Sequence, residues 1–258
     1  MTENTNDSNV DSSLDPLDWR SVRAQGHRML DDILDYIEHI RDRPVWKPMP
    51  DKVREHFRQG VPVAPTNLSA VHEEFMHYIL PFANGNSHPA FMGWVHGGGN
   101  IPGVLAEMLA AGLNSNLGGR DHAPIEVERQ IVQWMRQLFG FPETASGLFV
   151  TGTSMANLLG VLVARTAALG VEVRRNGIAG NNRLVAYASA AAHGCITQAM
   201  DLSGLGTAAL RIIPTNSRQQ IDFYALKRAI AADRRANLMP FLVIGNAGTV
   251  DIGAIDDL

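Results

Sequence analysis

A turn of small residues at 151–157 has the composition of a phosphate-binding site. Gly152, Thr153 and Ser154 follow an apolar stretch at 148–150 and precede a long apolar run that predicts a helix. The first amides of a helix have no intrahelical acceptor and carry the positive end of its dipole. These three residues can therefore hold a phosphate with backbone N–H groups and hydroxyls. The alternative is that Ser154 only caps the helix.

Two further segments follow predicted strands in the same way. His193 comes after a predicted strand at 183–188, and Thr249 lies in the small, polar segment 245–249 after another. Ligands of parallel sheets bind beyond the carboxyl ends of the strands, so these residues can converge with the turn at 151–157. A histidine there can stack on a planar cofactor. The alternatives are a structural histidine and ordinary turn chemistry.

A serine esterase is a rival interpretation of the same serine. His96 and the glycines 97–99 resemble the oxyanion-hole motif of lipases and esterases, with Ser154 as an imperfect nucleophile. In that class an acid and then a histidine follow the serine along the chain. Asp251 and Asp256 follow Ser154, but His193 precedes both and no histidine comes after them. The sequence therefore favours the phosphate site over the esterase.

Alternating strands and helices are predicted from residue 147 onward, and they would position these groups. The predicted strands are 148–150, 183–188, 209–213 and 241–245, and the predicted helices are 154–169, 194–202 and 222–236. Strands that alternate with helices predict an α/β fold with a mostly parallel sheet of four strands. The helix at 222–236 should turn Leu226, Ile230 and Ala231 inward.

The first part of the chain is predicted to be helical. An amphipathic helix opens at Asp15-Pro16 and runs to about Ile40, and an extended, proline-rich connector follows at 43–50. This arm either packs on another subunit or folds back on its own domain. Further helices are predicted at 68–80, 101–113 and 125–138, and residues 1–14 are predicted to be a disordered tail.

Composition excludes several classes of protein. The 258 residues are 45% hydrophobic and 19% charged, with a net charge of −4, so nucleic acid is not an expected partner. One cysteine, Cys195, suits a reducing compartment and a cytoplasmic location. The apolar stretch 148–168 carries polar residues and predicts a buried strand and helix, so no membrane partner is expected. His72 and His77 are five residues apart, a poor metal spacing, and no metal site is expected.

Seven motifs in order along the chain give a specific resemblance. They are His88–Val95, the glycines 97–99 after it, Asn114–Asn116, Val127–Arg129, Thr151–Asn157, Ala192-His193 and Ala247–Thr249. From about residue 15 onward the sequence resembles the pyridoxal-phosphate-dependent group II amino-acid decarboxylases, the family of the aromatic-amino-acid decarboxylases. The resemblance implies an aspartate-aminotransferase-type fold (fold type I), a homodimer and an active site at the dimer interface. It divides the chain into an arm at 15–66 and a cofactor-binding large domain at 67–258.

The resemblance also assigns roles to individual residues. Phe91 and Trp94 match the segment that lines the substrate pocket. Met155 and Val250 depart from the family pattern at positions that can change cofactor grip or reaction outcome, and some members carry out oxidative deamination or aldehyde formation. The residues implied at pyridoxal 5'-phosphate are Gly152, Thr153 and Ser154 at the phosphate, His193 stacked on the ring as the catalytic residue, and Thr249 near cofactor and substrate.

Two groups that the family chemistry needs have no match in these 258 residues. The chain has only three lysines, Lys47, Lys52 and Lys227, and none stands where the family has its Schiff-base lysine. Asp251 and Asp256 do not match the aspartate that pairs with the ring nitrogen. The prediction is a decarboxylase-like protein for an amino acid, with part of the cofactor site, completed by further C-terminal sequence or a partner chain. The alternatives are a non-catalytic binding or dimerisation subunit and the esterase.

Overall fold

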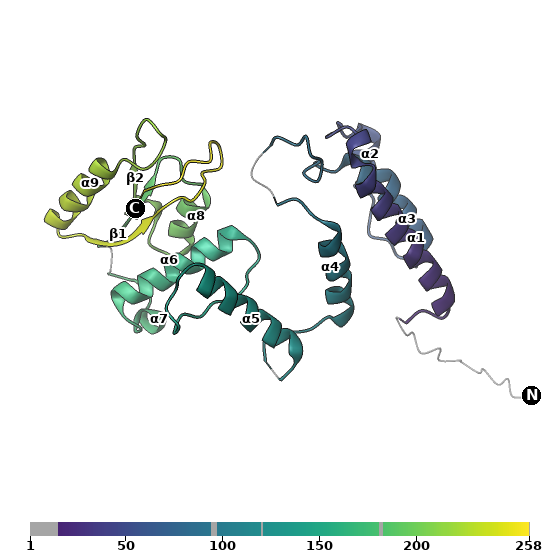
Figure 1. Ribbon diagram of the computed structural model, residues 1–258, viewed down its shortest axis with the longest axis horizontal. Coiled ribbons are helices and arrows are strands. Elements are labelled where there is room, and N and C mark those ends of the chain that lie inside the picture. Colours follow the sequence, from purple (N-terminus) through teal and green to yellow (C-terminus); the bar gives the residue numbers. More distant parts are fainter. Residues whose placement is uncertain (1–14, 94–96, 120, 181–182, 258) are drawn as a thin grey trace, which may run out of the picture. The chain divides into compact units, whose positions relative to one another are not determined.

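The computed structural model shows two compact units that divide between Asn114 and Ser115 (Figure 1). The structure describes residues 15–93, 97–119, 121–180 and 183–257. The predicted tail at 1–14 lies outside them. The boundary predicted at residue 66, between an arm and a cofactor-binding domain, comes from the family resemblance and stays a prediction.

The described part of the first unit is built from helices. They are α1 (Trp19–Glu38), α2 (Asp51–His56), α3 (Leu68–Glu74) and α4 (Ile101–Leu113), with 3-10 turns at Ile40–Asp42 and Leu80–Phe82 and a π-helical turn at Phe75–Ile79. The α1 helix begins four residues later than the predicted Asp15, because the carboxylate of Asp18 accepts from the Arg20 amide at 2.9 Å and caps it.

Helices α1 and α3 are joined by a chain of polar contacts. Nδ1 of the buried His72 accepts from the Gln25 amide at 3.0 Å, and the His72 Nε2 lies 3.4 Å from the Asp32 carboxylate. Arg28 donates to the Gln25 oxygen, which orients the Gln25 amide toward His72. The pair of helices is therefore held by specific polar contacts.

The second unit combines helices with a parallel sheet. Its helices are α5 (Ala123–Leu138), α6 (Thr153–Leu169), α7 (Val173–Asn176), α8 (Cys195–Leu202) and α9 (Phe223–Arg235), and its strands are β1 (Leu184–Ser189), β2 (Leu210–Ile213) and β3 (Met239–Ile244). The strand order is β2-β1-β3, with both pairings parallel. All six residues of the central β1 are buried, whereas β3 at the edge is partly exposed.

Helices cover both faces of this sheet (Figure 1). On one face Ala186 and Ala188 of β1 pack against Val161 of α6 and Met200 of α8. On the other face, Val185 and Tyr187 pack with a cluster that includes Leu226 of α9. Alternate residues of one strand thus serve two cores, which explains why β1 is apolar almost throughout. The predicted α/β class is confirmed.

The predicted strand at 148–150 is wrong. The described residues form three strands rather than four, and 148–150 run as irregular backbone. A strand needs a neighbour for its backbone hydrogen bonds, and here the Phe149 amide donates instead to the Glu128 carboxylate at 3.0 Å. On α9, Leu226 is buried and Ile230 half-buried as predicted, but Ala231 is exposed.

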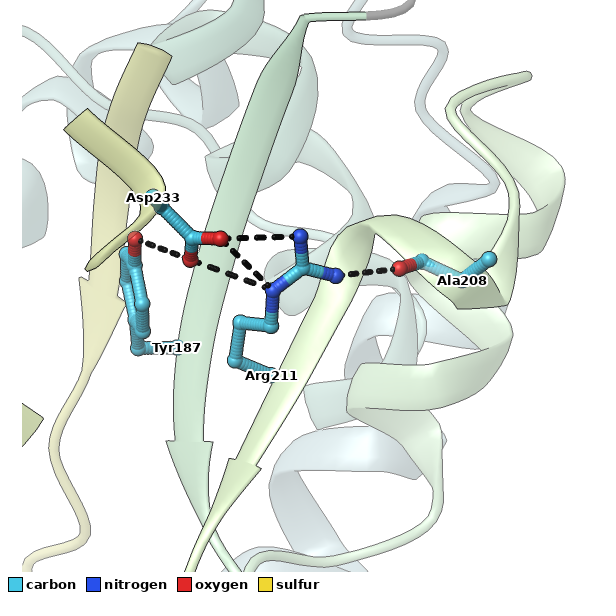
Figure 2. Close-up of polar contacts among 4 residues, drawn as sticks. All are labelled: Tyr187, Ala208, Arg211 and Asp233. Carbon is cyan, nitrogen blue, oxygen red and sulfur yellow. Dashed lines mark hydrogen bonds and ion pairs between the residues drawn. The ribbon is translucent and has the colours of Figure 1, made fainter. Parts of the chain in front are cut away.

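A polar cluster ties α9 to the sheet (Figure 2). The Tyr187 hydroxyl of β1 donates to Asp233 of α9 at 2.8 Å, and Arg211 of β2 donates to both oxygens of the same carboxylate at 3.0–3.2 Å. Arg211 also donates to the Ala208 carbonyl at 2.8 Å. The hydrogen bonds from Arg211 lower the pKa of Asp233, and burial together with the Asp233 carboxylate raises the pKa of Tyr187.

Candidate cofactor site

The N-terminus of α6 is a set of unused hydrogen-bond donors. Gly152 stands at the N-cap with φ +87°, a conformation that favours glycine, and no side chain caps the helix. The amides of Thr153, Ser154 and Met155 have no acceptor among the described residues. By contrast, side chains cap the N-termini of α1, α3, α4 and α9 through Asp18, Asn67, Asn100 and Asp222.

These donors are exposed to solvent, and all of them present partial positive charge. Thr153 and Ser154 are exposed, and neither hydroxyl donates to or accepts from another described group. The helix behind them has 17 residues, so the positive end of its dipole adds to the amide donors. Backbone amides, hydroxyls and a helix N-terminus together form the donor set that a phosphate group needs. The turn therefore fits the phosphate of pyridoxal 5'-phosphate.

His193 lies next to this turn, and its ring is oriented by a backbone hydrogen bond. Its Nδ1 accepts from the Cys195 amide at 3.1 Å, at the start of α8, and the residue is exposed. The Asn157 amide of α6 donates to the Cys195 sulfur at 3.2 Å, which joins the first turns of the two helices. The structure thus brings the α6 turn and the His193 segment together, with the histidine ring accessible for stacking.

Thr249 lies on the loop that follows β3 and is buried, with 4% of its surface exposed. Its hydroxyl oxygen accepts from the Ala254 amide at 3.0 Å, so it already has a partner in its own loop. The Asn246 amide donates to the Ser189 hydroxyl at 3.1 Å and joins the carboxyl ends of β3 and β1. Thr249 and His193 therefore follow strands whose ends are linked, and the role of Thr249 at the cofactor stays a prediction.

The predicted substrate residues belong to the first unit of the chain, whereas the turn at 151–157, His193 and Thr249 belong to the second. Phe91 lies in the first unit and is half-buried, and Trp94 lies outside the described residues. Their place in a substrate pocket stays a prediction.

The esterase alternative gains no support from the geometry. In the part of the chain that the structure describes, no histidine makes the hydrogen bond to Ser154 that a general base would make. His96 lies outside the described residues. Nor do the described histidine, cysteine, aspartate and glutamate side chains form a group of three that could hold a metal ion.

The structure gives Asp256 a role that the sequence did not assign to it. Its carboxylate accepts from the Ile221 amide at 2.6 Å and from the Asn246 backbone and side-chain amides at 2.8 and 2.9 Å. An acid that closes a loop ten residues after Asn246 has no local pattern. The sequence signal that could have pointed to this network is Asn246, a polar residue directly beyond a predicted strand.

Comparison with known proteins identifies the family. Residues 50–258 match the family described as the pyridoxal-dependent decarboxylase conserved domain. The chain is 32% identical to the aromatic-L-amino-acid decarboxylase of Bacillus atrophaeus over 94% of its own length and 49% of that protein. It is 28% identical to a phenylacetaldehyde synthase of Arabidopsis thaliana, covering 95% of this chain and 51% of that one.

Solved structures agree in fold. The crystal structure of Oryza sativa TDC with PLP and tryptamine matches with a TM-score of 0.83 and 26% identity, over 95% of this chain and 52% of that one. The chain spans about half the length of these relatives. Among the described residues, no helix is both long and apolar enough to cross a membrane. With the matched family domain extending over most of its length, the chain belongs to the pyridoxal-dependent decarboxylases, which have the type I fold of pyridoxal-phosphate enzymes.

Proposed function

We propose that this chain is the cofactor-binding part of an enzyme that removes a carboxyl group from an amino acid. The observation that carries the proposal is the uncapped N-terminus of α6 beside an oriented, exposed His193, in a chain of this family. Among the described helices, α6 has the longest run of N-terminal amides without an acceptor, namely those of Thr153, Ser154 and Met155.

Different residues of the chain bind the phosphate and the ring of the cofactor. Gly152, Thr153 and Ser154 bind the phosphate through amides and hydroxyls, and His193 lies against the ring. When bound, pyridoxal phosphate supplies an electron sink for the carbanion that loss of CO₂ leaves behind. His193 can hold the ring without reorganisation, because its Nδ1 is already hydrogen-bonded to the Cys195 amide.

The Schiff-base lysine and the ring-nitrogen aspartate are proposed to come from further C-terminal sequence or from a partner chain. Lys227 is on α9, where its ammonium group lies 4.4 Å from the centre of the Phe223 ring. Lys47 and Lys52 belong to the first unit. A non-catalytic subunit on the same scaffold is the second candidate. It is favoured because none of the three lysines stands where the family has its Schiff-base lysine.

The relatives support an aromatic amino acid as the substrate class. Their names include aromatic-L-amino-acid and tyrosine decarboxylases. They also include phenylacetaldehyde synthases, so the products of a complete enzyme should be assayed for both amine and aldehyde. A homodimer and a cytoplasmic location complete the proposal, the second motivated by the single cysteine. Sedimentation and cell fractionation test them.

Calorimetry with pyridoxal phosphate and with pyridoxal tests the phosphate site. The Thr153→Ala/Ser154→Ala double variant removes two hydroxyl donors to a charged group, so its affinity for pyridoxal phosphate should fall by about tenfold or more. Its affinity for pyridoxal, which lacks the phosphate, should not change. The matched control is Thr144→Ala/Ser146→Ala, which removes exposed hydroxyls from the same unit. Equal losses in both double variants, or no binding by the wild type, would contradict the proposal.

Co-expression separates the two candidate functions. We expect CO₂ release from an aromatic amino acid when the chain is produced with a segment that supplies the lysine and aspartate. If such a complex binds the cofactor but releases neither CO₂ nor aldehyde, the non-catalytic subunit is the better description.

A further inference from the structure

The carboxylate of Asp256 connects three segments at the carboxyl edge of the sheet. It accepts from Ile221, the residue before the N-cap of α9, and twice from Asn246, directly beyond β3. The Asp256 amide in turn donates to the Asn246 carbonyl at 2.8 Å. Hydrogen bonds to an ionised acceptor are stronger than neutral ones, so this one side chain fixes the geometry of both neighbours.

The same network reaches the strand that leads to His193. The Asn246 side-chain amide, which donates to Asp256, also donates to the Ser189 hydroxyl at 3.1 Å. Ser189 ends β1, is almost fully buried, and lies four residues before His193. The orientation of the Asn246 amide is set by the Asp256 carboxylate, since only its NH₂ group can donate to both acceptors.

The segment between Asn246 and Asp256 is a closed loop that contains Thr249. Ala247 and Ile255 form an antiparallel bridge, and the Thr249 amide donates to the Ala254 carbonyl at 3.0 Å. The Ala254 amide returns a hydrogen bond to the Thr249 hydroxyl. The position of Thr249 therefore depends on the two ends of the loop staying together, and the Asp256 side chain adds two hydrogen bonds from Asn246 to the backbone contacts that join them.

We propose that Asp256 is a positioning residue for the cofactor site, which acts by fixing the Thr249 loop against the end of β1 that leads to His193. The inference rests on the proposed function, because it concerns His193, which is assigned there to the cofactor, and Thr249, which the family resemblance places near it. It differs from a purely structural role in one respect. The α6 turn that would hold the phosphate makes none of these contacts, so loss of Asp256 should affect the ring end of the site and leave the phosphate end unchanged.

Asp256→Asn tests this, with Asp251→Asn as the matched control. The substitution places an NH₂ group in a position that three N–H donors now face, so at least one donor loses its acceptor. Asp251 is in the same loop and exposed, and its side chain has no polar partner among the described residues. Both variants remove one negative charge, which separates the hydrogen bonds from the net charge.

The affinities for pyridoxal phosphate and for inorganic phosphate are measured on the full chain, together with the rates of amide hydrogen exchange. In Asp256→Asn we expect affinity for pyridoxal phosphate to fall by about tenfold, while inorganic phosphate competes as well as it does in the wild type. Exchange of the Thr249 and Ala254 amides should speed up, and exchange within α6 should not. Asp251→Asn should match the wild type throughout.

The outcomes distinguish this inference from the proposed function. If the wild type binds no pyridoxal phosphate, the proposed function fails and the inference falls with it. If the wild type binds and Asp256→Asn binds equally well, only the inference is overturned. It is also overturned if the variant loses pyridoxal phosphate and inorganic phosphate in parallel with a lower melting temperature, since that pattern indicates general destabilisation.

Discussion

Two polar sites in the second unit differ in how far their hydrogen-bonding capacity is used. In the α9 cluster, defined as Tyr187, Arg211 and Asp233, both oxygens of the carboxylate and the tyrosine hydroxyl have partners inside the protein. In the α6 turn, defined as residues 151–157, the first helical amides and two hydroxyls have none among the described residues. Tyr187 and Asp233 of the first site are buried and Arg211 is half-buried, whereas Thr153 and Ser154 of the second site are exposed.

The difference separates polar groups that stabilise the fold from polar groups that are free to bind a ligand. Buried polar groups must be paired, because an unpaired one costs its desolvation free energy. Donors at an exposed helix terminus are solvated and exchange water for an anion at little cost. Substitutions in the α9 cluster should therefore change stability, and substitutions in the α6 turn should change ligand affinity.

Asp233→Asn should give the largest effect on stability. It leaves the Arg211 guanidinium beside a neutral group and one Tyr187 or Arg211 donor without its acceptor, so the free energy of unfolding should fall by about 3 kcal/mol. Urea unfolding followed by circular dichroism measures it. The exposed Asp201 on α8, changed to Asn, is the control. A loss below about 0.5 kcal/mol would show that the cluster does not stabilise the fold.

Acid should remove the same contribution in the wild type. Arg211 holds the pKa of Asp233 below its ordinary value. A carboxyl with a lowered folded-state pKa contributes stability above its unfolded pKa, about 3.9, and loses it as the pH falls through the folded-state value. The stability difference between wild type and Asp233→Asn should be constant near neutral pH and shrink below about pH 4. A difference that persists unchanged at low pH would contradict the assignment.

The α6 turn could be predicted from sequence because its features are local. Small residues before an apolar run mark a helix start wherever that helix packs, and α6 begins at Thr153, one residue from the predicted 154. The strands β1, β2 and β3 were predicted within two residues for the same reason, since their apolar runs and flanking polar residues are contiguous. The family resemblance, based on ordered short motifs, is confirmed.

The α9 cluster and the Asp256 network could not be predicted, because they join residues far apart in the chain. Tyr187 and Asp233 are 46 residues apart, and Ile221 and Asp256 are 35 apart. The six-residue helix α2 was missed because it is too short for helical periodicity to show. The strand predicted at 148–150 failed for the opposite reason, since an apolar triplet forms a strand only beside a partner strand.

Tyr187→Phe should lower the free energy of unfolding by less than Asp233→Asn does. It should also change how that free energy depends on pH in the alkaline range. Loss of one hydrogen bond to a carboxylate lowers the free energy of unfolding by about 1–2 kcal/mol near neutral pH. Burial raises the pKa of Tyr187, so its contribution is present below the unfolded value of about 10 and is lost as the pH rises further. The difference between wild type and Tyr187→Phe should therefore shrink above about pH 10. Tyr224→Phe, at an exposed site, should show no difference at any pH.

The smallest effect on stability is expected at Ser154, and it decides between a cap and a ligand site. Asp222 caps α9 by accepting from the Ala225 amide at 2.9 Å, so Asp222→Ala should cost about 1 kcal/mol of unfolding free energy. Ser154→Ala removes no such bond and should change that free energy by less than about 0.5 kcal/mol. With saturating inorganic phosphate, the wild type should gain more stability than Ser154→Ala, because only a group that contacts the anion alters this gain. If Ser154→Ala instead costs as much as Asp222→Ala and the gain from phosphate is unchanged, Ser154 is a helix cap and the phosphate site lies elsewhere.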